Sequence, residues 1–141
     1  MAEFETYSFF CEDVRWESNG SPIIISLMSP VFNATEYPAT FKQIVFVSCF
    51  RASLDVESFD VTLKLVRTKG EDEEIIGEFG ASYHKSPEDD EGMQWAAISH
   101  LPLGEISLEE GQSLIATVSS DDQSWQTCLT AGRKLELASN Q

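Results

Sequence analysis

Basic residues are scarce in this sequence. Its 141 residues contain 9 lysines and arginines against 24 aspartates and glutamates, a formal net charge of −15 at pH 7. A nucleic-acid backbone and an anionic membrane both repel such a chain, so direct binding to either is disfavoured. The charge favours a protein partner with a basic surface, for example a nucleic-acid-binding complex. The alternative is that the acidity only keeps a folded domain soluble.

Long apolar runs and paired cysteines are also missing. No stretch approaches the ~18 consecutive apolar residues that a membrane span needs, and the opening MAEFETYSFF lacks the basic segment of a signal peptide. The cysteines Cys11, Cys49 and Cys128 are odd in number and far apart, unlike the disulfide framework of a small secreted domain. We therefore expect a cytoplasmic protein with three reduced, mostly buried thiols.

The sequence shows no helical periodicity. No long segment repeats its apolar residues at the helical spacing of about 3.6, so we expect little or no helix. In Val56–Thr68, in contrast, apolar and polar residues alternate, which predicts a strand with one face in a core. Lys42–Phe50 is apolar at almost every position, as in a central strand covered on both faces.

Further short strands are predicted at turn-separated intervals along the chain. They are Phe4–Cys11, Ile23–Met28, Glu74–Ala81, Met93–Leu101, Ser113–Val118 and Trp125–Leu129. Pro30–Thr40 is predicted to be an irregular loop, and Leu101–Gly104 to break a strand. The pattern predicts one all-β domain over residues 1–141, an antiparallel two-sheet sandwich of the immunoglobulin-like or C2-like type with about eight strands.

Several motifs resemble a family of small bacterial and phage β-sandwich proteins of unknown function. The resemblance rests on Phe10-Cys11-Glu12-Asp13-Val14-Arg15, Asn19-Gly20, Pro38-Ala39-Thr40 and Leu108-Glu109-Glu110-Gly111. It implies a compact immunoglobulin-like sandwich. It implies no known activity and transfers no site residues.

No motif for catalysis, cofactor binding or zinc binding is present. The two histidines, His84 and His100, are not accompanied by a Gly-x-Ser-x-Gly elbow or by paired cysteines. We therefore predict a non-enzymatic protein without cofactor or metal. A hydrolase with an unrecognised site around His84 or His100 is the alternative from the enzyme class.

Two acidic runs are the candidate partner-binding residues. Glu71, Asp72, Glu73 and Glu74 form the first run and Glu88, Asp89, Asp90 and Glu91 the second, both on predicted loops. The leading hypothesis is a protein-binding module that presents these loops to a basic surface. The alternatives are a phage-encoded inhibitor that mimics nucleic acid, of the anti-defence or anti-CRISPR type, and a calcium site built from loop carboxylates.

Apolar contacts offer another binding mode. Phe32 and Tyr37 in the Pro30–Thr40 loop, and Trp16 in a polar segment, could anchor a partner or fold back over the sandwich. An unprotected edge strand could also pair with a partner or a second copy, although the sequence does not identify the edge. A monomer and a homodimer are equally compatible with the sequence.

Overall fold

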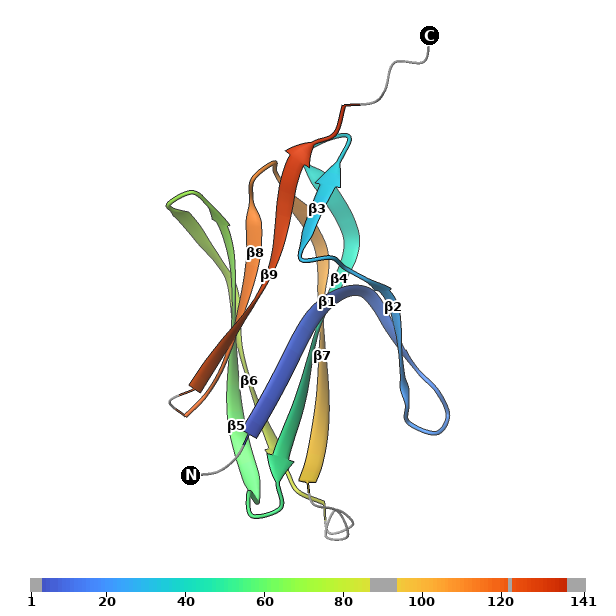
Figure 1. Ribbon diagram of the computed structural model, residues 1–141, viewed down its shortest axis with the longest axis vertical. Coiled ribbons are helices and arrows are strands. Elements are labelled where there is room, and N and C mark those ends of the chain that lie inside the picture. The colour runs from blue at the N-terminus through green and yellow to red at the C-terminus, as the bar shows by residue number, and fades with distance from the viewer. Residues whose placement is uncertain (1–3, 87–93, 122, 137–141) are drawn as a thin grey trace.

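The chain folds into two β-sheets that face each other (Figure 1). The computed structural model describes residues 4–86, 94–121 and 123–136, which contain nine strands and no helix. The strands are β1 (Phe4–Trp16), β2 (Pro22–Leu27), β3 (Val31–Ala34), β4 (Ala39–Ser53), β5 (Ser58–Lys69), β6 (Asp72–His84), β7 (Gln94–Leu108), β8 (Ser113–Ser120) and β9 (Gln123–Lys134). The predicted all-β sandwich is thereby confirmed.

The strand orders show which strands lie at the edges. One sheet has four strands in the order β2-β1-β4-β7, and the other has five in the order β3-β9-β8-β5-β6. Neighbouring strands are antiparallel except for β3 and β9, which are parallel. The first two strands, β1 and β2, pair with each other, and so do the last two described strands, β8 and β9.

The main core lies between the sheets and follows the alternation in the sequence. Val61 and Leu65 of β5 are buried, as the period of two predicted. They pack in one cluster with Phe46 and Phe50, which project from β4 of the facing sheet. The neighbours of the two phenylalanines on β4, among them Val45 and Val47, point to the opposite side of the sheet. That side must therefore have a cover of its own.

The β1–β2 hairpin provides this cover. Residues Phe4–Cys11 of β1 pair with β4, and Asp13–Trp16 pair only with β2; Cys11 pairs with both strands. Cys11, Val45 and Val47 form a second buried cluster, against which the hairpin packs Val14 and Ile24. The predicted end of the first strand at Cys11 was thus wrong, because strand pairing continues to Trp16. Phe9 also belongs to this outer cluster and not to the sandwich centre.

Two other local predictions were wrong. The predicted Pro30–Thr40 loop contains β3, whose Phe32 packs against the main core and lies edge-on to Phe41 at 5.3 Å between ring centroids. The predicted break at Leu101–Gly104 is a register shift within β7, where Gly104 takes a φ of 75°. Glycine tolerates this backbone conformation, so the strand passes through the irregularity and continues to Leu108.

Candidate functional site

The first acidic run lies where β5 turns into β6. Only Gly70 and Glu71 form the turn, and Asp72–Glu74 are already strand residues, which corrects the prediction that all four acids lie on a loop. All four acids are exposed. Glu74 is partly neutralised by Arg67, whose Nη2 lies 2.8 Å from its Oε2. The remaining three carboxylates have no ion pair among the described residues.

A second acidic turn lies beside the first. Lys69 Nζ lies 3.2 Å from Oε2 of Glu109, which begins the turn between β7 and β8. The adjacent Glu110 accepts a hydrogen bond from the main-chain N–H of Lys134. We call these residues the acidic end: Glu71, Asp72, Glu73, Glu74, Glu109 and Glu110. Sequence reasoning missed the last two because nothing local indicates that the two turns are neighbours.

The second predicted run, Glu88–Glu91, lies outside the described residues. The described residues that bracket it in sequence are Ser86 and Gln94. Strand β6 separates the first run from Ser86, and its 13 residues span about 40 Å at ~3.3 Å per residue. Ser86 therefore lies at the opposite end of the sandwich from Glu71, as the course of β6 in Figure 1 shows.

Both histidines are exposed strand residues. His84 is exposed at the end of β6, opposite Ser58 of β5. His100 is exposed in β7, and its ring contacts Trp16. Within residues 4–86, 94–121 and 123–136, no group of three or more histidine, cysteine or acidic side chains is arranged to hold a metal ion.

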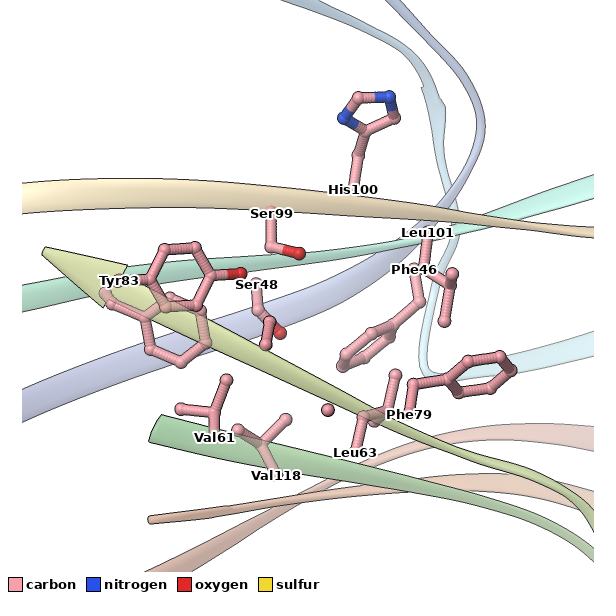
Figure 2. Close-up of a pocket in the computed structure, with 13 residues that line it drawn as sticks. Phe46, Ser48, Val61, Leu63, Phe79, Tyr83, Ser99, His100, Leu101 and Val118 are labelled. Atoms are coloured by element: carbon pink, nitrogen blue, oxygen red, sulfur yellow. The ribbon is translucent and has the colours of Figure 1, made fainter. Parts of the chain in front are cut away.

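A cleft of about 210 Å³ opens between the edge strands β6 and β7. Its walls are mainly apolar. They include residues of the main core or packed against it, Phe46, Phe50, Val61, Leu63, Tyr83 and Val118, together with Phe79 and Leu101. Figure 2 shows the Ser48 and Ser99 side chains on the cleft side of their strands, while the His100 ring points away. The cleft is smaller than the ~300 Å³ typical of the smallest ligand sites, and is comparable to one large side chain.

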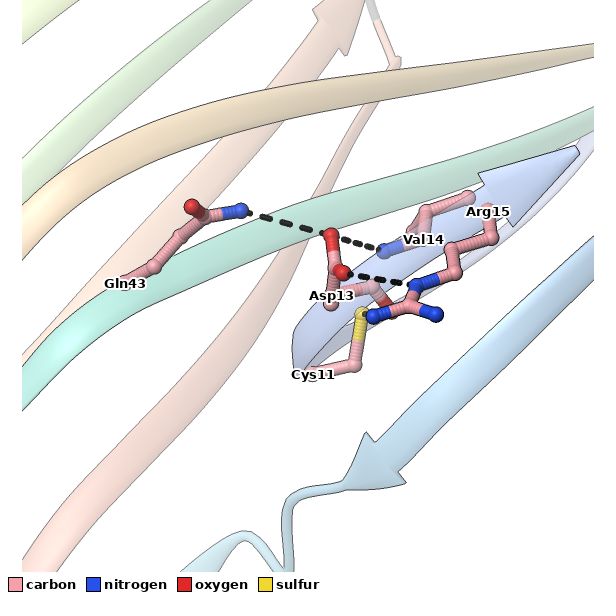
Figure 3. Close-up of polar contacts among 5 residues, drawn as sticks. All are labelled: Cys11, Asp13, Val14, Arg15 and Gln43. Atoms are coloured by element: carbon pink, nitrogen blue, oxygen red, sulfur yellow. Dashed lines mark hydrogen bonds and ion pairs between the residues drawn. The ribbon is translucent and has the colours of Figure 1, made fainter.

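Asp13, two residues after Cys11, has a structural role where β1 separates from β4 (Figure 3). The carboxylate of Asp13 accepts hydrogen bonds from the main-chain N–H of Val14 at 2.9 Å and from Gln43 of β4 at 3.5 Å. Asp13 follows the point at which β1 stops pairing with β4. Its carboxylate therefore takes up main-chain and side-chain donors at the place where the strands separate.

The three cysteines differ in exposure. Cys11 is fully buried, and its burial raises the pKa of the thiol. Cys49 is half-buried, and burial raises its pKa too, while contact with Cys49 raises the pKa of Tyr7. Cys128 is exposed, so the prediction of mostly buried thiols was wrong for this residue. All three are free thiols.

Comparisons with known proteins identify no family. No protein-family model and no curated protein matches the chain. Among solved structures, the chain is similar to part of a β-glucosidase from Erythrobacter marinus, with 9% sequence identity and a TM-score of 0.41. The match covers 92% of this chain and 15% of the glucosidase chain. Among the described residues, no helix has the length and apolarity to cross a membrane.

Proposed function

We propose that this protein is a non-enzymatic protein-binding module that presents its acidic end to a basic partner surface. The scaffold would be a sandwich of the immunoglobulin-like or C2-like type. The observation that carries the proposal is the Lys69–Glu109 contact, which joins two acidic turns distant in sequence. A sheet-based scaffold holds these side chains in fixed register, so their negative potential acts on one side of the molecule.

The acidic end would act by attracting a partner of opposite charge. Exposed carboxylates contribute little to stability, and they act instead on encounter with a partner of opposite charge. Arg67 and Lys69 neutralise part of the cluster and hold it in place. Glu71, Asp72 and Glu73 are left as the residues that meet a basic partner. Binding of this kind weakens as salt screens the charges beyond about 10 Å at 0.1 M ionic strength.

A charge-reversal experiment tests the proposal. The variant carries Glu71→Lys, Asp72→Lys and Glu73→Lys, and is compared with the wild type in affinity capture from lysate at low and high salt. The matched control carries Glu12→Lys, Glu17→Lys and Glu78→Lys, three exposed acids outside the acidic end. Both variants change the net charge equally. We expect the first to lose salt-sensitive partners and the control to keep them.

The outcomes separate the proposal from its alternatives. Equal loss in both variants would show that only the total charge matters, which contradicts a defined site. Partners that survive high salt and both variants would indicate binding through apolar contacts. Partners that are nucleic-acid-binding complexes, and that added DNA or RNA displaces, would favour the inhibitor that mimics nucleic acid.

A further inference from the structure

The first half of strand β7 is a sheet edge without the usual protection against pairing. β7 ends the four-stranded sheet, just as β6 ends the five-stranded sheet, and no described strand pairs with the outer side of either. Edge strands are normally protected by charges, proline or bulges. β6 carries Asp72, Glu73, Glu74 and Glu78, whereas β7 has no aspartate, glutamate, lysine or arginine from Gln94 to Gly104. Pro102 and the irregularity beside it limit the open stretch to Trp95–Leu101.

The cleft lies on the inner side of this stretch. Ser99 of β7 pairs in register with Ser48, and Ala81 of β6 pairs with Val61, so Ser99 and Ala81 are the small residues at the two edges of the cleft. Phe79 and Tyr83 lie two residues before and after Ala81 on β6, so their side chains point to the same face of the strand and flank Ala81. We call the space over Ala81, between Phe79 and Tyr83, the notch. A strand placed beside β7 would therefore direct one side chain into this notch.

The outer side of the same stretch carries an apolar row, with Arg51 beside it. Tyr7, Cys49 and Ile98 form one row across β1, β4 and β7. Tyr7 is 68% exposed and Ile98 is 42% exposed, because the β1–β2 hairpin covers only the neighbouring part of this face. A hollow of about 230 Å³ lies along the row. Side chains on the outer face of an added strand would extend this row.

We infer that Trp95–Leu101 of β7 binds an extended segment of a basic protein partner by strand addition. Main-chain hydrogen bonds to the free edge supply affinity, and the cleft selects the inward side chains. Since apolar side chains lie on both faces beside β7, the segment carries apolar residues at successive positions rather than at alternate ones. The inference goes beyond the acidic end and does not depend on it.

Charge decides between the possible occupants of this edge. Arg51 lines the outer hollow, but the chain as a whole has a net charge of −15, and the exposed Glu105 follows the open stretch of β7. A second copy would bring an equal negative charge, whereas a segment flanked by lysine or arginine would be attracted. The short cleft accepts one large side chain and not a cofactor-sized molecule. The occupant is therefore an apolar peptide segment with basic flanks.

Peptide selection on the intact protein tests the inference. The probe is a displayed library of random peptides of about nine residues, enough to span the open stretch of β7. We expect the enriched sequences to have a run of apolar residues, with an aromatic or large aliphatic residue among them, and lysine or arginine on either side. An enriched peptide, synthesised and labelled with fluorescein, then reports affinity. Hydrogen exchange should slow at β7 and remain unchanged at the outer side of β6.

Two pairs of variants locate the binding site. Ala81→Trp fills the notch, and Ser82→Trp is its control because the next residue of a strand points to the other face. Ile98→Lys places a charge on the open edge, and Ile75→Lys is its control on the other edge strand, with a similarly exposed isoleucine. We expect Ala81→Trp and Ile98→Lys to weaken peptide binding by about tenfold or more, and both controls to change it by less than about threefold.

Three results would overturn the inference. The first is the absence of any enriched sequence. The second is an enriched peptide whose affinity is unchanged by both Ala81→Trp and Ile98→Lys. The third is a concentration-dependent dimer that Ile98→Lys dissociates, which would assign the edge to a second copy. The triple-lysine variant of the acidic end should keep peptide affinity, so failure at this edge and failure of the proposed function are distinguishable.

Discussion

Trp16 lies against His100, with 5.4 Å between the ring centroids and an angle of 56° between the ring planes. Trp16 ends β1 and His100 lies within β7, and β4 separates these two strands in the sheet. The contact therefore spans β4 on its outer face and fastens the β1–β2 hairpin there. The sequence makes Trp16 a candidate anchor for a partner, and 45% of it remains exposed, but its ring contact is within the chain.

Replacing this tryptophan should loosen the hairpin. We expect Trp16→Ala to lower the free energy of unfolding by about 1–2 kcal/mol, since an aromatic pair adds to the loss of buried surface. Urea unfolding measures the stability, and hydrogen exchange of residues 12–27 should be faster. Trp16→Phe keeps a ring and should recover more than half of the loss. Unchanged exchange in Trp16→Ala would show that the hairpin is held by Val14 and Ile24 alone.

Gly132 of β9 provides a test of how closely β3 approaches β9, and Gly80 of β6 is the control. A Cβ on Gly132 would lie 2.1 Å from Asn33 Oδ1 and 2.9 Å from the Phe32 carbonyl oxygen, so it would clash with both atoms. On Gly80 the nearest atom would be the Val61 carbonyl oxygen at 3.9 Å, an ordinary contact. We expect Gly132→Ala to cost about 2 kcal/mol and Gly80→Ala less than about 0.5 kcal/mol. Thermal unfolding compares them, and equal costs would contradict this close approach.

The cysteines should differ in reactivity. At about pH 8, iodoacetamide should modify Cys128 first, Cys49 more slowly and Cys11 only after unfolding, because thiolate character and access set the rate. Mass spectrometry of the labelled peptides gives the order. Modification of Cys11 at the rate of Cys128 in the folded protein would contradict the burial of Cys11.

The buried Cys11 thiol also predicts how stability depends on pH. Its pKa is raised from 9.0 in the folded state, so the unfolded chain loses this proton first as the pH increases. The folded state then binds more protons than the unfolded state, and the free energy of unfolding falls with rising pH above the ordinary thiol value. Cys11→Ala should reduce this part of the alkaline slope, measured by urea unfolding across the pH range.

The strands that could be predicted are those whose pattern is local. β5 shows the period of two within its own residues, and β4 shows a continuous apolar run, so both faces of each were predicted. β3 has only four residues, and it exists because Val31 and Phe32 pair with Thr130 and Ala131. Such pairing between distant residues leaves no periodic signal in a short segment.

The candidate site was predictable to the same extent. The Glu71–Glu74 run is visible in the sequence as charge, but its partner turn at Glu109 becomes a neighbour only through the order of strands β5 and β8 and the Lys69 contact. The sequence allows for an unprotected edge strand but does not locate it. Only the sheet order identifies β7 as that edge, since its apolar sequence is equally typical of a central strand.

The strand orders also constrain when the fold can be completed during synthesis. β4 obtains its second neighbour only when β7 has been made, and β3 pairs with β9, the last of the described strands. A nascent chain that has reached β6 therefore exposes one side of its most apolar strand and has no partner for β3. Interactions between distant segments form slowly, and exposed strand edges favour aggregation. We expect the growing chain to depend on the ribosome or a chaperone for protection until the final hairpin emerges.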